Sequence, residues 1–187
     1  IDTLLCFGSN GRIYSVPVAS LPGGRGDGQP LTTLLDLQAG TQLLHYFAGT
    51  AQATLLLSIS AGYGFIASVA DMTSRQRAGK AFITCNEDEA VCPPAPIAPT
   101  ATHIACASAG GRLLTFALSE LKTMPNGGRG LMLMSLEDKD SLLGAAAYSR
   151  SIRISGMGRC NKPRAEVLEI RSLNNAAAAR ARKGKQA

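Results

Sequence analysis

The sequence predicts an all-β fold, built as a propeller-like array of about four blades. The first observation is a unit of strand, glycine turn, strand and basic loop, which is clearest between Ile59 and Phe82. The second is that this unit returns at intervals of about 50 residues, a spacing typical of propeller blades. The third is that apolar and polar residues alternate on either side of each turn, as they do in half-buried strands.

Glycines set the register of the copies, because glycine adopts positive φ in tight turns without steric cost. The turn glycine and the loop glycine recur together as the pairs Gly11 and Gly26, Gly64 and Gly79, and Gly111 and Gly130. A fourth, weaker copy runs from Gly158 to Gly184. The repeats are predicted at about residues 1–50, 51–98, 99–148 and 149–187. The array itself is predicted to span 1–173, followed by a basic, alanine-rich C-terminal segment at 174–187.

The elements follow from this register. Residues 2–21 are predicted to form a hairpin around Gly11. The strands that come after the basic loops are predicted at residues 31–37 and 43–47, 81–85 and 97–98, and 131–136. Weaker strands are predicted around residues 152–154 and 167–170, and a short helix at 176–182.

Matched apolar positions of the hairpins are predicted to face the core. These positions are Leu4 and Cys6, Leu57 and Ile59, and Ile104 and Cys106. Cysteines at such positions are expected to act as small buried apolar residues. The chain has 5 cysteines without paired CxxC spacing. This pattern argues against a disulfide framework or a zinc site and indicates a reducing cytoplasm.

The net charge of +6 is unevenly distributed along the chain. Residues 150–187 contain 10 of the 19 lysine and arginine residues but only 2 of the 13 acidic residues. A basic end on a near-neutral body indicates a polyanion partner, most often nucleic acid. A solvated, disordered tail is an equally good interpretation of the charge alone.

Basic residues before position 150 fall mostly at equivalent places in the repeats. Eight of the nine do so, namely Arg12, Arg25, Arg75, Arg77, Lys80, Arg112, Lys122 and Arg129. In a radial array equivalent positions line one rim, so these cations are predicted to form a band that binds phosphates. The predicted DNA-binding set also includes Arg153, Arg159, Lys162, Arg164, Arg180, Arg182, Lys183 and Lys185. The alternative is that charged residues simply gather in surface loops.

Other motifs carry little chemistry. The tripeptide Arg25-Gly26-Asp27 is not repeated, and its loop lacks the lysine and hydroxyl residue of a nucleotide-binding P-loop. His45 and His103 have no ligand spacing, and the acidic loops at 87–89 and 137–140 are expected to be solvated. No catalytic residue, cofactor, metal ion or small-molecule ligand is expected in this chain.

Two stretches resemble a known family closely. SNGRIYSVPVASLPGGRGDGQPL and SAGYGFIASVADMTSRQRAGKAFIT are similar to the C-terminal domain of the A subunit of bacterial DNA topoisomerase IV. The resemblance implies a β-pinwheel of four-stranded antiparallel blades, possibly an open or broken ring, with duplex DNA on its outer rim. It also implies a further blade before Ile1 and a closing strand after Ala187.

The resemblance implies a non-catalytic part of a type IIA topoisomerase, an isomerase that acts in decatenation, supercoil relaxation and chromosome segregation. The cleavage tyrosine is expected upstream of this chain. ATP and Mg²⁺ are expected to act through a separate partner chain, in a heterotetramer of two A and two B subunits. The implied location is cytoplasmic and nucleoid-associated, with possible peripheral association with the inner membrane.

Two alternatives stay open. The first is the DNA-wrapping C-terminal domain of gyrase, whose glutamine-and-arginine box is only partly matched by Gln76-Arg77-Ala78-Gly79-Lys80. The second, from another class, is a propeller that binds protein.

Overall fold

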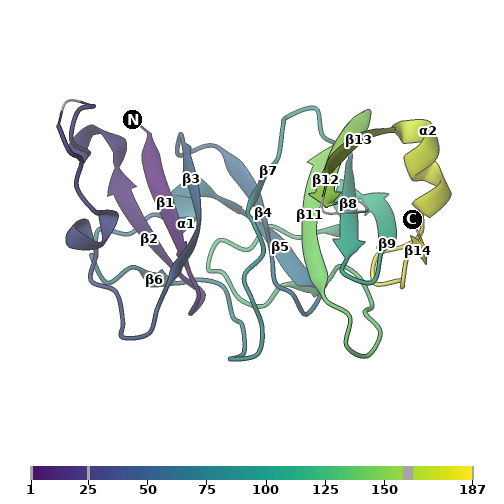
Figure 1. Ribbon diagram of the computed structural model, residues 1–187, viewed down its shortest axis with the longest axis horizontal. Coiled ribbons are helices and arrows are strands. Elements are labelled where there is room, and N and C mark those ends of the chain that lie inside the picture. The colour runs from purple at the N-terminus through teal and green to yellow at the C-terminus, as the bar shows by residue number, and fades with distance from the viewer. Residues whose placement is uncertain (1, 25, 158–161, 187) are drawn as a thin grey trace.

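The computed structural model describes residues 2–24, 26–157 and 162–186. These residues form three four-stranded antiparallel sheets and one two-stranded sheet, which confirms the predicted all-β class. Figure 1 shows the sheets following one another along the longest axis, with the two ends of the chain on opposite sides. The array is therefore open rather than closed into a ring.

The first blade is the sheet with strand order β3-β1-β2-β6. Its central hairpin joins β1 (Thr3–Gly8) to β2 (Arg12–Pro17) around the predicted turn. The outer strand β3 (Leu43–Gly49) pairs with β1. The fourth strand, β6 (Lys80–Ala81), comes from the second repeat and pairs with β2.

The second and third blades repeat this plan. The second has the order β10-β5-β4-β7, and the third has the order β11-β8-β9-β14. The second blade's strands are β4 (Thr54–Ser58), β5 (Tyr63–Ser68), β7 (Ala95–Pro96) and β10 (Leu131–Met132). The third blade's strands are β8 (His103–Ser108), β9 (Arg112–Ala117), β11 (Leu142–Tyr148) and β14 (Lys185–Gln186).

Each of these blades is completed by a strand from the next repeat. The short strands β6, β10 and β14 pair with β2, β5 and β9, respectively, in each case with the first two residues of the hairpin strand. Neighbouring repeats are therefore joined through backbone hydrogen bonds as well as side-chain packing.

The fourth repeat differs from the others. Its hairpin, β12 (Ser151–Met157) and β13 (Pro163–Glu169), forms a two-stranded sheet with no further strand from the described residues. The helical turn α2 (Ile170–Leu173) follows, and the repeat then supplies β14 to the third blade.

Within the described residues, helical structure is limited to short turns. The turn α1 (Val69–Met72) begins with a capping box in which Ser68 and Asp71 bond to each other's backbone N–H groups. The 3-10 turns are η1 (Val18–Ser20), η2 (Leu31–Leu34), η3 (Leu118–Glu120) and η5 (Asn174–Ala176).

Three predicted elements are wrong. The strand predicted at residues 97–98 forms two residues earlier, at β7 (Ala95–Pro96). Residues 31–37 begin with η2 instead of forming a strand. A strand there needs the hairpin edge of a preceding repeat, and no described residue supplies one. Residues 177–182 form no helix, because Ala177 bridges to Thr115 of β9 and residues 180–182 form a turn and a bend. There Ala178 N donates to Thr115 O, and Ala181 N donates to Leu133 O.

The register of the second copy is corrected by two residues. The turn glycine with positive φ is Gly62, at 86°, and it corresponds to Gly11 and Gly111, at 75° and 78°. Gly64 lies within β5 and pairs with Leu131. Side chains alternate between faces with a period of two, so the error left the predicted core face unchanged.

The core lies between consecutive blades. One buried cluster joins Leu5 and Phe7 of β1 to Leu55 and Leu57 of β4, and a second joins the second blade to the third. The predicted inward pairs are confirmed, with Leu4 half-buried and the others buried. Burial raises the thiol pKa of Cys6 to about 11 and that of Cys106 to about 12, so both are inert apolar residues.

Candidate nucleic-acid interface

The loop at residues 73–79 presents two exposed arginines. It is held on β2 through Ser15, whose hydroxyl donates to Ser74 O at 2.6 Å and accepts from Ser74 N at 2.8 Å. Arg75 and Arg77 are both exposed and border a hollow of about 640 Å³ on the first blade. A fixed backbone with exposed guanidinium groups is suited to a phosphate chain.

Arg77 is partly engaged within the molecule. Its guanidinium donates to Thr33 O at 2.7 Å and to Leu34 O at 3.2 Å, and it lies 3.8 Å from the Asp36 carboxylate. Its side chain is still 58% exposed, so its charge remains available at the surface.

Lys80, at the end of the same loop, is directed inward. Its Nζ donates to Asp71 O at 2.9 Å and lies 5.3 Å from the centre of the Phe82 ring. Lys80 therefore connects the loop to α1. Of the three cations predicted on this loop, Arg75 and Arg77 lie at the surface, whereas Lys80 holds the loop in place.

Arg12 and Arg112 occupy the same place in their repeats and make the same kind of contact. Arg12 donates to Ala78 O and Gly79 O, both at 2.9 Å. Arg112 donates to Gly184 O at 3.4 Å. The loop glycines Gly79 and Gly184 belong to the following repeat in each case. These arginines therefore join consecutive repeats.

Arg129 is bound to a carboxylate. Its two terminal nitrogens donate to the two oxygens of Glu89 at 2.6 and 2.8 Å, in a bidentate pair. The guanidinium also lies 4.6 Å from the centre of the ring of Tyr63, the residue equivalent to Arg12 and Arg112. The hydrogen bond from Arg129 lowers the pKa of the Glu89 carboxyl.

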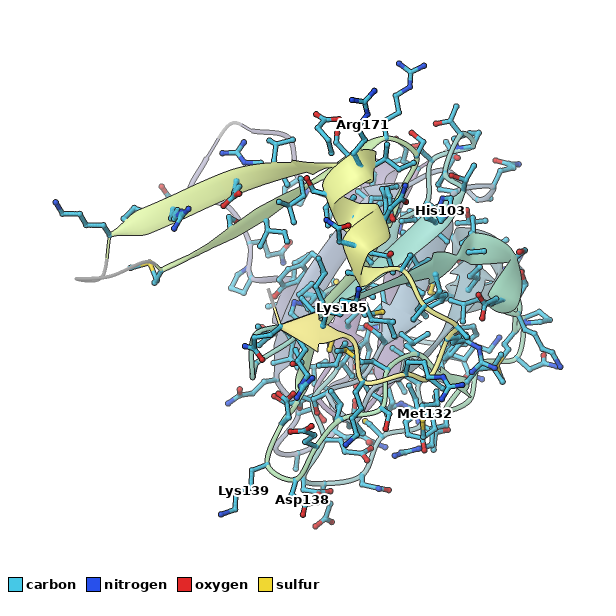
Figure 2. The ribbon with its side chains drawn as sticks, turned by 90° about the vertical axis from the view of Figure 1, so that its right-hand side faces the viewer. His103, Met132, Asp138, Lys139, Arg171 and Lys185 are labelled. Atoms are coloured by element: carbon cyan, nitrogen blue, oxygen red, sulfur yellow. The ribbon has the colours of Figure 1, made fainter. Side chains whose placement is uncertain are left out.

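The cations of residues 180–185 include side chains that are bound within the protein and side chains that are exposed. Arg180 donates to Met132 O at 2.6 Å, and its backbone N–H donates to Glu120. Lys183 shares the Glu137 carboxylate with Arg112, at 3.5 and 3.0 Å. Arg182 and Lys185 are exposed, and Figure 2 shows Lys185 on the end face of the array, between Arg171 and Lys139.

The remaining predicted cations lie at the surface. Lys122, Arg153, Lys162 and Arg164 are exposed, and Arg164 lies 3.2 Å from Glu166. Arg25 and Arg159 fall outside the described residues. Sequence reasoning missed two exposed arginines beside the fourth hairpin, Arg150 and Arg171. Neither arginine has an equivalent cation in the other repeats. The local density of positive charge was therefore the one signal in the sequence that could have identified them.

Neither a metal centre nor a membrane-spanning helix occurs within residues 2–24, 26–157 and 162–186. No group of three or more histidine, cysteine or acidic side chains there is placed to hold an ion. No helix of this part of the chain has the length and apolar character needed to cross a membrane.

The fold defines an open β-propeller whose exposed cations lie mostly in loops and on the fourth hairpin. A family model described as "DNA gyrase C-terminal domain, beta-propeller" matches residues 2–36 and 102–149. The DNA topoisomerase 4 A subunit of Neisseria gonorrhoeae is 38% identical over 155 residues, which are 80% of this chain and 20% of that protein. The Escherichia coli K12 protein of the same name is 34% identical over 73% of this chain and 18% of its own length.

Solved structures agree with these relatives. The E. coli ParC C-terminal domain superposes with a TM-score of 0.86 and 29% identity, over 100% of this chain and 76% of that one. A DNA gyrase A C-terminal domain gives 0.75 at 18% identity, over 98% and 59%, which shows a shared fold alone. The chain belongs to the family of C-terminal β-propeller domains of the gyrase and topoisomerase IV A subunits. It spans about one fifth of the length of the curated relatives it matches.

Proposed function

We propose that this chain is the non-catalytic domain of a topoisomerase IV A subunit that binds and bends duplex DNA. The observation that carries the proposal is its similarity to two DNA topoisomerase 4 proteins, each matched over more than two thirds of this chain. In the whole enzyme, the domain would steer the choice of DNA crossovers in decatenation and supercoil relaxation.

A topoisomerase IV origin is favoured over gyrase. The curated relatives that we compared carry the topoisomerase 4 name, and the ParC domain is more similar in sequence than the gyrase domain. The partial glutamine-and-arginine motif at residues 76–80 also supports bending without full wrapping.

The DNA-binding surface is proposed to follow the exposed cations, with Arg75 and Arg77 on the first blade as its best-defined part. Guanidinium groups on loops contact phosphates without reading bases, so binding is expected to be independent of sequence. Arg12, Lys80, Arg112 and Arg129 instead hold the loops in place, since each is bound within the protein.

The partners and boundaries are proposed from the family. In a cytoplasmic heterotetramer of two A and two B subunits on the nucleoid, the B chains would supply ATP hydrolysis and Mg²⁺. Residues 1–173 would form most of the pinwheel, and the basic segment 174–187 would complete its third blade through β14. The membrane association implied by resemblance has no support in the described residues and is not part of the proposal.

The test is equilibrium DNA binding across a series of salt concentrations. The double variant Arg75→Ala, Arg77→Ala should bind every duplex sequence more weakly. It should also flatten the slope of log affinity against log salt by about 2 units, since each neutralised phosphate adds about −0.9. Lys139→Ala, a change at an exposed cation outside the repeat register, is the control and should leave the slope unchanged.

Unchanged binding by the double variant would remove the first blade from the interface. A wild-type domain that binds no duplex at either low or high salt would instead favour the protein-binding propeller.

A further inference from the structure

The fourth hairpin is unlike the other three in its surroundings. The hairpins β1–β2, β4–β5 and β8–β9 each have a strand on both edges, whereas β12 and β13 pair only with each other among the described strands. The ladder is regular from Ser151 opposite Glu169 to Met157 opposite Pro163. In Figure 2 these two strands project to the left, away from the body of the molecule.

The base of the hairpin is firmly anchored. Ile170 N donates to Arg150 O at 2.7 Å and closes the two strands where they leave the third blade. Ile152 and Leu168, on the inner face, pack against a buried cluster that includes Tyr148 and Leu173. The ribbon is therefore held in a fixed direction at one end while its outer part is exposed.

The outer face of the ribbon carries Arg153 beside exposed apolar side chains, whereas Arg164, opposite Gly156, lies on the inner face. Arg153 stands opposite Val167, which is 57% exposed, and Met157 on the same face is 66% exposed. Five exposed cations occur in residues 150–157 and 162–171, against two acidic residues, Glu166 and Glu169. These cations are Arg150, Arg153, Lys162, Arg164 and Arg171.

This combination fits duplex DNA. A two-stranded antiparallel ribbon has the dimensions of the major groove. Its cations suit the flanking phosphates, and exposed methionine and valine side chains suit contact with thymine methyl groups inside the groove.

We propose that the β12–β13 hairpin is a DNA-binding arm that enters the major groove with its Arg153, Met157 and Val167 face. The proposal rests on the proposed DNA-binding function, and it adds a second contact separate from the loop of Arg75 and Arg77. The loop holds phosphates on the first blade, and the arm engages the duplex at the other end of the array (Figure 1).

Two pairs of variants test the arm in the intact chain. Lys162→Ala is compared with Lys139→Ala, since both remove one exposed lysine. The arm variant should weaken duplex binding and flatten the salt slope by about 1 unit, whereas the control should not. The double variant Met157→Ser, Val167→Ser is compared with Leu143→Ser, a change at an exposed apolar residue of β11 that is 60% exposed.

Entry of the arm into the major groove is tested by a separate measurement. Protection of guanine N7 from dimethyl sulfate reports occupation of the major groove, because N7 faces that groove. The wild type should protect guanines, the double serine variant should lose this protection, and Leu143→Ser should keep it. Circular dichroism establishes that each variant keeps the wild-type fold. Lys162→Ala, at an exposed residue, tests the arm even if the serine variant unfolds.

Failure of the proposed DNA-binding function and failure of the arm proposal give different results. A wild type that binds no duplex overturns the proposed function and the arm together. Normal binding, salt slope and N7 protection in all arm variants, combined with weaker binding by the Arg75 and Arg77 variant, overturns the arm alone. Serine variants that change self-association in light scattering but not DNA binding would make the hairpin a protein contact and also overturn the arm.

Discussion

The cations at equivalent places in the repeats are of two kinds: some are exposed, and others are bound within the protein. The groups that surround each cation decide which kind it is. Arg75 is exposed, whereas Arg129 is held by both oxygens of Glu89. The Glu89 side chain is only 10% exposed, and it also accepts from the backbone N–H of Asn86 at 2.9 Å. The pair fixes the third repeat's loop against the second blade and removes one cation from the proposed DNA-binding surface.

The Arg129–Glu89 pair should contribute measurably to stability. Glu89→Gln removes the charge from a nearly buried acceptor and leaves Arg129 with a weaker partner. We expect it to lower the free energy of unfolding by about 1 kcal/mol, the scale of a charged hydrogen bond that is partly exposed to solvent. Urea unfolding checks this. Glu87→Gln, at an exposed residue of the same loop, should change stability by less than about 0.5 kcal/mol.

The same pair predicts a pH dependence. Bonding to Arg129 lowers the pKa of Glu89 below its ordinary value of 4.5, so the folded state holds this proton less tightly than the unfolded state does. Its contribution to stability is therefore complete above pH 4.5 and is lost as the pH falls through the folded pKa. The stability difference between wild type and Glu89→Gln should shrink on acidification below 4.5. A difference that stays constant from neutral pH to about pH 3 would contradict this assignment.

The sequence predicted where the cations occur but not which of them are exposed. Arg129 and Glu89 are separated by 40 residues, and Arg112 and Glu137 by 25. Such pairs form only when the blades pack, and the repeat pattern contains no information on that contact. The sequence likewise does not show the partner of Lys80, so it places Lys80 on the predicted DNA surface. In the structure its ammonium group donates to Asp71 O.

The loop glycines show why the strands at the blade junctions form. Gly79, Gly130 and Gly184 have φ of 67°, 82° and 74°, and each immediately precedes the strand that completes the preceding blade. A Cβ on Gly184 would lie 2.7 Å from Leu113 O, and one on Gly79 would lie 2.8 Å from Ile13 O. Only glycine allows this approach without strain.

Gly184→Ala should therefore destabilise the third blade. Both the positive φ and the contact with Leu113 O disfavour a side chain, so we expect a loss of about 1–3 kcal/mol in unfolding free energy. Gly23→Ala is the control, because a Cβ there meets nothing within 4 Å. Thermal and urea unfolding compare the two. If Gly184→Ala proved as stable as the wild type, residues 174–187 would not be an integral part of the third blade in solution.

The alternation of apolar and polar residues along the strands was predictable from the sequence. The pairing of a short strand of one repeat with the hairpin of the preceding repeat was not. Alternating apolar residues indicate a hairpin, and an error of two positions at Gly64 did not change which side faced the core. Short strands such as β6 have two residues and carry almost no periodic signal. Their position depends on the neighbouring hairpin edge, which explains why residues 31–37 were wrongly predicted as a strand.

At the level of the whole molecule, the open arrangement separates two kinds of surface. The first blade carries the anchored loop of Arg75 and Arg77, and the projecting hairpin lies at the opposite end of the array (Figure 1). At two junctions, Arg12 and Arg112 contact the following repeat, so the protein itself fixes how these repeats lie against one another.

The isolated chain should not cleave DNA or form a covalent adduct with it, and the positions of its four tyrosines give the physical reason. A nucleophilic tyrosine needs an accessible hydroxyl, but Tyr14 is fully buried and Tyr148 is only 4% exposed. The Tyr63 ring lies beneath the Arg129 guanidinium, which is itself bound to Glu89. Tyr46 is 51% exposed on β3, so it is the tyrosine that the test has to address.

We therefore expect purified residues 1–187 to bind supercoiled plasmid without changing its linking number, with or without ATP and Mg²⁺. Denaturing gels of protein incubated with labelled DNA should show no covalent complex, because the proposed function makes this chain the non-catalytic domain and three of its four tyrosines are buried or covered. The control is Tyr46→Phe, which should be indistinguishable from the wild type in both assays. A covalent band that disappears in Tyr46→Phe would show that this domain carries cleavage chemistry of its own.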